Sequence, residues 1–153
     1  MEKFNFLVRQ ARSYFETADH LAYVTYPMIR EVKMLFIVVE NLHKASMKLV
    51  GAVLHYERLY KRIMHVPLEF SDRLDIFAKV ANRYKINYAL VETMKELKDL
   101  VEKHNKSPMV FSRGDKFVIA NDQFSLKTLD ITLLKKYILD IRTVLTKVEA
   151  IKQ

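Results

Sequence analysis

A run of four heptads between Lys33 and Met64 constrains the fold of this chain more than any other feature. One series of residues, seven apart, consists of Leu35, Leu42, Leu49, Tyr56 and Ile63, and a second series, three residues later, consists of Val38, Ala45, Ala52 and Leu59. Residues with this spacing share one face of an α-helix. At 1.5 Å per residue, the pattern predicts a helix of about 45 Å.

This heptad helix is either one strand of a coiled-coil dimer or one arm of an intramolecular bundle. Small Ala45 and Ala52 allow a neighbouring helix to approach closely, and Gly51 marks a candidate tight crossing. Three other segments, residues 3–23, 88–104 and 130–151, also carry apolar residues at spacings of three and four. Because the chain supplies these partner helices itself, the bundle is favoured.

Few residues interrupt the helical segments. The chain has two glycines and three prolines in 153 residues, whereas β-sandwiches and barrels need many turns rich in Gly and Pro. Pro27 is expected to end the first helix at Thr25-Tyr26, and Pro67 to end the heptad helix. Ser71 and Asp72 then predict the cap of a short third helix.

The pattern changes after Pro108. Residues 109–111 and 116–119 are rich in β-formers, and Gly114 between them supplies the left-handed conformation of a hairpin loop. Residues 121–123 predict a second turn, residues 124–129 an extended segment, and Asp130 the cap of the last helix. The sequence therefore predicts one mainly α domain over residues 1–153: a helical bundle of four longer helices and one short helix, with a small β-hairpin before the C-terminal helix.

Composition excludes several kinds of chemistry. Without cysteine, the chain has no disulfide, thiolate nucleophile or cysteine metal site. The five histidines lie in no zinc-binding spacing, and two glycines do not build a phosphate-binding loop, so neither a metal nor a cofactor is expected. The N-terminus lacks the apolar run of a signal peptide, and the longest apolar stretch, residues 34–39, is too short to cross a bilayer. We expect a cytoplasmic protein with no membrane contact.

Charge is the compositional feature that bears on function. The chain has 26 basic and 18 acidic residues, a net charge of +8 and a pI near 9.6. Such a surface attracts RNA or another polyanion, unless it is only a solvated basic face. Arginine pairs with phosphate, and tyrosines such as Tyr56 and Tyr60 offer stacking faces for unpaired bases. The candidate nucleic-acid-binding residues are Arg58, Lys61 and Arg62 on the heptad helix, Arg83 and Lys85 after the short helix, and Arg113 and Lys116 at the hairpin.

Two segments resemble the HEPN (higher eukaryotes and prokaryotes nucleotide-binding) family. Residues 11–21 resemble the first helix of these domains and residues 42–54 are similar to the second, so the resemblance covers about the first 65 residues. It implies a helical bundle, often dimeric, whose active members are ribonucleases with an arginine followed after four to six residues by a histidine. Arg58 and His65 match this spacing, which implies Arg58 on the phosphate and His65 as acid or base. The pair departs from the family in standing earlier in the bundle and in having Leu59 where a polar residue usually follows the arginine.

Three functions remain open. The leading one is a non-catalytic RNA-binding or assembly module that uses the basic surface. The second is a structural protein that forms a homo-oligomer, through the long heptad helix, or binds another partner. The third is a HEPN-like ribonuclease with Arg58 and His65 as its catalytic candidates.

Overall fold

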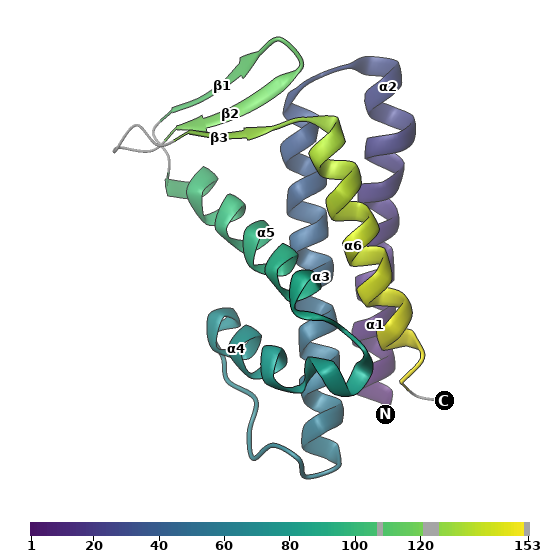
Figure 1. The fold of residues 1–153 in the computed structure, drawn as a ribbon. Coiled ribbons are helices and arrows are strands. Elements are labelled where there is room, and N and C mark those ends of the chain that lie inside the picture. Colours follow the sequence, from purple (N-terminus) through teal and green to yellow (C-terminus); the bar gives the residue numbers. More distant parts are fainter. Residues whose placement is uncertain (107–108, 121–125, 152–153) are drawn as a thin grey trace.

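The computed structural model describes residues 1–106, 109–120 and 126–151. Helical segments make up 75% of these residues, and a small antiparallel sheet precedes the last helix (Figure 1). The α-helices are α1 (Glu2–His20), α2 (Tyr26–Ile29), α3 (Lys33–Leu59), α4 (Phe70–Val80), α5 (Tyr88–Lys106) and α6 (Ile131–Glu149). The strands are β1 (Met109–Arg113), β2 (Lys116–Ala120) and β3 (Leu126–Leu129). The mainly α prediction is confirmed, and β3 adds a third strand to the predicted hairpin.

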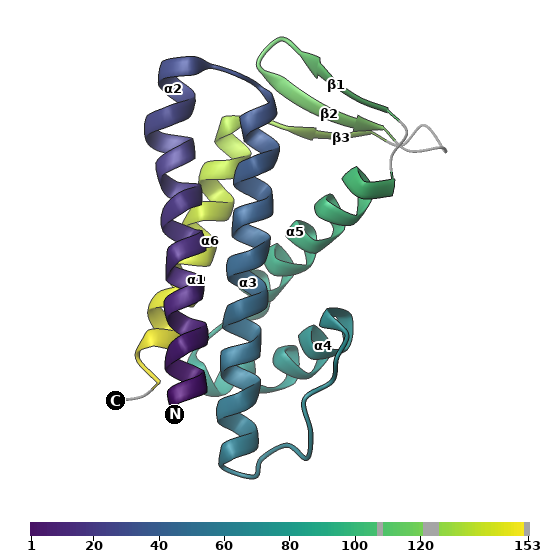
Figure 2. The ribbon, with the colours of Figure 1, turned by 180° about the vertical axis from the view of Figure 1, so that it is seen from behind.

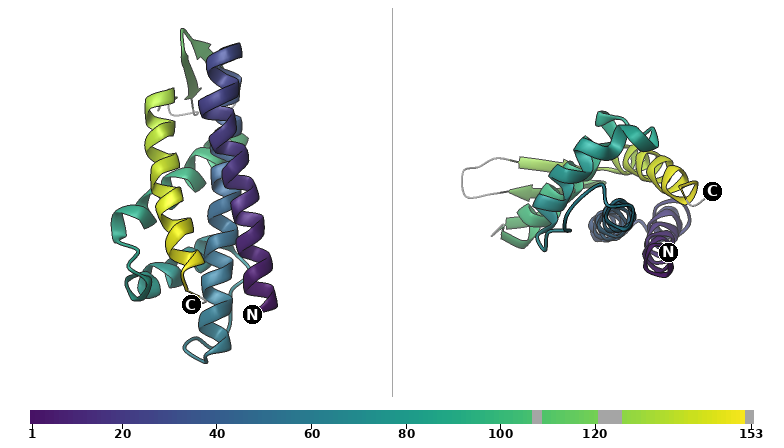
Figure 3. Two further views of the ribbon diagram at one scale, coloured as in Figure 1. Left: turned by 90° about the vertical axis from the view of Figure 1, so that its right-hand side faces the viewer. Right: turned by 90° about the horizontal axis from the view of Figure 1, so that it is seen from below.

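Helix α3 forms the centre of the bundle and packs against α1, α4, α5 and α6. Helices α1 and α6 run alongside it, with α4 and α5 on its other side (Figures 2 and 3). Six residues of the two heptad series are fully buried: Leu35, Val38, Leu42, Ala45, Leu49 and Ala52. Because helices of the same chain cover this face, the bundle interpretation of the heptads is confirmed.

The heptad helix is shorter than the sequence predicted, because α3 ends at Leu59 rather than near Met64. Lys61 takes a left-handed conformation with φ of 59°. Its N–H donates to the carbonyl of Arg58, and the N–H of Arg62 donates to the carbonyl of Glu57. These two bonds form a Schellman motif, which turns the chain out of the helix. Leu59 is therefore exposed instead of buried in the heptad face.

The first helix does not stop before Pro27, as the sequence predicted. A π-helical turn over Leu21–Thr25 connects α1 to α2, which continues to Ile29 and is ended by Arg30 in a left-handed conformation. The N–H of Tyr26 bonds to the carbonyl of Leu21, five residues back. This wider turn accommodates the proline ring next to it, and Pro27 sits among the first residues of α2, where its missing N–H matters least.

Of the two helix caps that the sequence predicted, one is confirmed and one is wrong, and a further cap occurs at Asn87. The Asp130 side chain accepts a hydrogen bond from the N–H of Leu133 at 2.8 Å, as expected for the cap of α6. Asn87 accepts in the same way from the N–H of Leu90, at the start of α5. The cap predicted at Ser71 and Asp72 is wrong: α4 begins at Phe70, and its N-cap is Glu69, which makes no side-chain capping bond.

The sheet closes one end of the bundle. Its order is β1-β2-β3, with Arg113 paired to Lys116 across the turn and Phe117 paired to Leu129. Gly114 in the turn has φ of 62°, which confirms the predicted left-handed hairpin residue. The ring of His104 stacks on those of Phe36 and Phe117, with distances between ring centroids of 3.7 Å and 6.1 Å. His104 thereby connects α5 to α3 and β2. The turn predicted at residues 121–123 lies outside the described residues.

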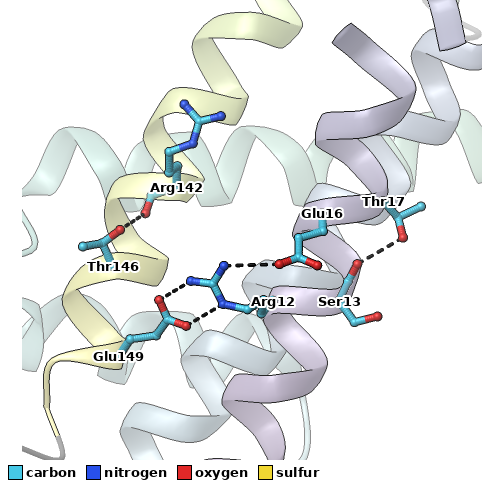
Figure 4. Close-up of polar contacts among 7 residues, drawn as sticks. All are labelled: Arg12, Ser13, Glu16, Thr17, Arg142, Thr146 and Glu149. Atoms are coloured by element: carbon cyan, nitrogen blue, oxygen red, sulfur yellow. Dashed lines mark hydrogen bonds and ion pairs between the residues drawn. The ribbon is translucent and has the colours of Figure 1, made fainter. Parts of the chain in front are cut away.

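Ion pairs join α1 to α6 (Figure 4). The Arg12 guanidinium donates to Glu149 through Nε at 2.7 Å and through Nη2 at 2.5 Å, and to Glu16 at 3.3 Å. The hydrogen bonds to Glu149 raise the pKa of Arg12 above its ordinary value. Arg142 of α6 pairs with Asp19 at 2.9 Å, and its guanidinium lies over the Phe15 ring. None of the helices in the described part of the chain has the length and apolar character needed to cross a membrane.

Candidate functional site

Two adjoining hollows run along α1 and α3. The first has a volume of about 490 Å³ and is bordered by α1, α3 and Arg73 of α4. The second, of about 390 Å³, continues towards the C-terminal end of α3. Lys3 and His55 line both hollows, so we treat the two as one surface, the basic groove. Its cationic side chains are Lys3, Lys44, Lys48, Arg58, Lys61 and Arg73.

No carboxylate compensates this charge. Neither hollow is lined by an aspartate or a glutamate. Among the residues that the structure describes, none of the six cations forms an ion pair. Lys44 lies 5.7 Å from the Tyr14 ring centroid, and Arg73 Nε donates to the carbonyl of Pro67 at 2.5 Å. Among the described residues, the cations of the basic groove therefore have no carboxylate in the groove lining or at ion-pair distance, which favours the binding of an external anion.

Burial lowers the pKa of both histidines that line the groove, His43 and His55. Burial lowers the pKa of His55, and the positive charges of Lys3, Arg73 and Arg58 lower it further. These three cations come from α1, α4 and α3, so the fold brings charges that are distant in sequence around one ring. Burial likewise lowers the pKa of His43 to about 4, although Glu102 acts in the opposite direction. Both histidines are therefore neutral at pH 7.

The groove residues of α3 form a stripe along that helix. Successive members are separated by four, three, four and three residues, which keeps them on one helical face. Gly51 contributes no side chain to this stripe, and a Cβ at that position would meet Leu7 Cδ1 at 3.7 Å and Arg73 Nη1 at 3.8 Å. These are ordinary contact distances, so the tight crossing predicted at Gly51 is wrong. The stripe consists of Lys44, Lys48, Gly51, His55 and Arg58.

A second polar cluster, the Glu57 cluster, lies where α3 meets the turn after α4. The Glu57 carboxylate is fully buried, and the hydroxyl of Tyr84 donates a hydrogen bond to its Oε1 atom. Arg62 Nη1 lies 3.7 Å from this oxygen and Arg83 Nε lies 3.6 Å from it. Burial and the hydrogen bond to Glu57 raise the pKa of Tyr84. Arg62 and Arg83 thus have an internal counter-charge, unlike the cations of the basic groove.

The structure divides the seven predicted nucleic-acid-binding residues into separate groups. Arg58 and Lys61 line the basic groove, and Arg62 and Arg83 meet at the Glu57 cluster. Lys85 follows Tyr84 and is exposed, with φ of 60°. Arg113 and Lys116 pair across the hairpin, at the opposite end of α3 (Figure 1). Lys3, Lys44, Lys48 and Arg73 were not among the binding residues predicted from the sequence, although the α3 stripe is visible in the spacing of residues 44, 48, 51, 55 and 58.

The side chains of Arg58 and His65, the pair suggested by the HEPN spacing, form no hydrogen bond with each other in the described residues and do not line a common hollow. Both are exposed, Arg58 in the last turn of α3 and His65 in the connection to α4. His65 lines neither hollow of the basic groove, and no hydrogen bond between the two side chains occurs in the described ranges. The described residues also contain no group of three or more His, Asp or Glu side chains that could hold a metal ion.

Comparison of the chain with protein-family models, with curated proteins and with solved structures found no match. The resemblance of residues 11–21 and 42–54 to HEPN helices stays a prediction.

Proposed function

We propose that this chain is a non-catalytic RNA-binding module whose basic groove holds the phosphate backbone of the RNA. One observation carries the proposal: six cations from α1, α3, α4 and the turn after α3 line a continuous groove and have no carboxylate partner among the described residues. Lysine and arginine that are free of internal ion pairs are available to neutralise phosphates and to release their counterions.

The length of the charged stripe favours a polymer over a small anion. Lys44 and Arg58 are fourteen positions apart on one helix, which corresponds to about 20 Å at 1.5 Å per residue. A single phosphate contacts only a few neighbouring donors, whereas a nucleic-acid strand presents a phosphate at every nucleotide. A strand lying along α3 can therefore contact Lys44, Lys48 and Arg58 in succession.

Several features favour single-stranded RNA. The Tyr14 ring borders the basic groove beside Lys44, and the Tyr60 ring lies half exposed close to its other end, with the Arg62 guanidinium 5.5 Å from its centroid. Tyr60 is the exposed ring of the two, whereas Tyr14 is partly buried. An exposed ring next to a cation suits unpaired bases, which stack on aromatic faces while the backbone follows the charges. Tyr56, the other stacking candidate, packs between Phe4, Tyr60 and Tyr84 and is partly buried.

The non-catalytic part of the proposal rests on the placement of the acid–base candidates. Hydrolysis of RNA needs a proton donor or acceptor close to the cation that binds the phosphate. His65 stands outside the groove that Arg58 lines. His43 has a pKa of about 4, which makes it a weak base at neutral pH. His55 lines the groove beside Arg58, but burial and the charges of the neighbouring cations lower its pKa, which disfavours the protonated ring that a general acid needs.

Filter binding of a mixed-sequence single-stranded RNA across a series of salt concentrations tests the proposal. We expect the affinity to fall steeply and linearly on a logarithmic plot as salt increases, with the RNA left intact. Absence of binding at low salt would favour the structural, partner-binding hypothesis instead. Cleavage of the RNA by the wild-type protein, lost in Arg58→Gln, would favour the ribonuclease.

A further inference from the structure

The connection between α3 and α4 forms a tip at one end of the molecule (Figure 1). The tip comprises residues 60–69, and its apolar side chains divide into two groups. Ile63 and Val66 pack against the core, whereas Met64 and Leu68 are 92% and 93% exposed. Leu59 and Tyr60, which precede them, are each 54% exposed. The tip thus exposes a group of neighbouring large apolar side chains, rather than one isolated apolar residue.

The backbone of the tip is held in a defined position. Arg73 of α4 donates a hydrogen bond from Nε to the carbonyl of Pro67 at 2.5 Å. At the other end of the tip, the N–H of Arg62 donates to the carbonyl of Glu57 at 2.9 Å. Ile63 and Val66 add apolar anchors on the inner side. The exposed side chains are therefore displayed by a fixed scaffold.

Cations accompany the exposed apolar side chains. Arg58, Lys61 and Arg62 precede Met64, and residues 58–69 contain one carboxylate, that of Glu69. Arg58 and Lys61 have no ion-pair partner in the described part of the chain. Protruding apolar side chains with neighbouring cations match the surface of an anionic bilayer, where apolar groups enter the acyl boundary and cations contact lipid phosphates.

We propose that the tip docks this protein on an anionic membrane surface, with Met64 and Leu68 inserted between lipids and with Arg58 and Lys61 on the headgroups. This contact uses no membrane-spanning helix, and it departs from the sequence-based expectation of no membrane contact. It shares Arg58 and Lys61 with the basic groove but does not involve Lys44 and Lys48. A lipid surface suits the tip better than RNA does, because Met64 and Leu68 offer neither hydrogen bonds to base edges nor aromatic faces to stack on.

Cosedimentation with phosphatidylcholine vesicles, with and without phosphatidylserine, tests the tip. Wild type is expected to bind only the vesicles that contain phosphatidylserine, and Met64→Ser/Leu68→Ser to lose about tenfold or more in affinity for them. Met28→Ser/Ile29→Ser is the matched control, because these residues are 80% and 60% exposed on α2, at the opposite end of the molecule. The control is expected to bind as wild type does. Both pairs are exposed, so both variants should keep the helical circular dichroism of wild type.

A fluorescent reporter gives a second readout, because the chain contains no tryptophan. Met64→Trp should show a blue shift of its emission on phosphatidylserine vesicles, and Met28→Trp should not. The proposal is wrong if Met64→Ser/Leu68→Ser binds these vesicles as wild type does, or if the Met64→Trp emission stays unchanged. It is also wrong if that double variant keeps vesicle binding but loses RNA binding, or loses only self-association in sedimentation. Lys44→Gln/Lys48→Gln should bind vesicles normally, which separates this test from that of the RNA-binding proposal.

Discussion

The hydroxyl of Tyr84 donates a hydrogen bond to the carboxylate of Glu57, a residue that is fully buried near the end of α3. The same carboxylate oxygen lies within ion-pair distance of Arg62 and Arg83. Glu57 thereby joins the C-terminal part of α3, the tip and the turn that follows α4. The second oxygen, Oε2, is buried and has no hydrogen-bond partner among the described residues, so the network depends on the contacts to Oε1.

Removing the Tyr84 hydroxyl should destabilise the fold. Tyr84→Phe leaves a buried carboxylate without its closest donor, and a hydrogen bond to a charged group contributes about 1.5–3 kcal/mol. Urea titration at pH 7 measures the change in the free energy of unfolding. Tyr23→Phe is the control, because Tyr23 is exposed and, within the described residues, its one side-chain interaction is a ring contact with Lys135 that phenylalanine preserves. Equal stability of the two variants would contradict the central role of the Tyr84 contact.

The stability of the protein should decline with falling pH because of His43. Its pKa is 6.5 in the unfolded chain and about 4 in the folded protein, where burial disfavours the charged ring. Between these two values the unfolded chain binds more protons than the folded protein, so the free energy of unfolding decreases as the pH falls through this window. At 1.36 kcal/mol per unit, the full effect is on the order of 3 kcal/mol.

His43→Phe isolates this contribution, because its apolar ring can keep the edge contact of His43 with Phe70. Urea titrations of both proteins at pH 7.5 and about 5 should show a smaller loss of stability in the variant. Identical pH dependence in the two proteins would mean that His43 is protonated as readily in the folded protein as in the unfolded chain.

Gly51→Ala should stabilise the protein by about 1 kcal/mol, the difference in helix propensity between these residues. A Cβ at this position meets only side-chain atoms of Leu7 and Arg73, at 3.7 and 3.8 Å, so the added methyl group needs no rearrangement. Thermal unfolding followed by circular dichroism measures the shift of the midpoint. A lower midpoint would show that α1 packs more tightly on α3 than these distances indicate.

Leu49→Ala tests the heptad face of α3. Leu49 is fully buried, and its truncation should cost about 2–5 kcal/mol through lost burial and the cavity that remains. Leu139→Ala on the exposed side of α6 should cost far less, since Leu139 is exposed. If denaturant titration gave the two variants the same loss, the core would not lie where the heptads place it.

The sequence predicted those features of the fold that follow from the residue spacing within a single helix. Leu35, Leu42 and Leu49 could be placed in the core because helical spacing alone decides which face they share. The end of α3 could not be predicted, because its Schellman motif uses Lys61 in the left-handed conformation instead of the glycine that usually signals such a turn. The continuation of the helical segment past Pro27 was not predicted, because a π-helical turn over Leu21–Thr25 lets the chain accommodate the proline ring without ending the helix.

The candidate site was less accessible to prediction because it combines several elements. Lys44 and Lys48 are typical of the solvent face of a helix, and only the packing of α1 and α4 on α3 adds Lys3 and Arg73 to them. Arg62 and Arg83 were predicted to bind nucleic acid, but their pairing with Glu57 follows from the fold of the chain between them. Spacing identifies a charged face, whereas the partner charges around it depend on tertiary packing.

The RNA affinity of Lys44→Gln/Lys48→Gln, measured by filter binding across a salt series, tests the central proposal most directly. We expect weaker binding and a logarithmic salt slope flatter by about 1.4, since each lost contact with a single strand removes about 0.7. Lys103→Gln/Lys106→Gln removes the same charge from exposed positions of α5 outside the groove and should keep the slope of wild type. Stability should change little in either variant, because Lys44, Lys103 and Lys106 are exposed, Lys48 is partly exposed, and none of the four forms an ion pair in the described part of the chain. Equal slopes for wild type and both variants would contradict the account and leave the basic groove a solvated surface.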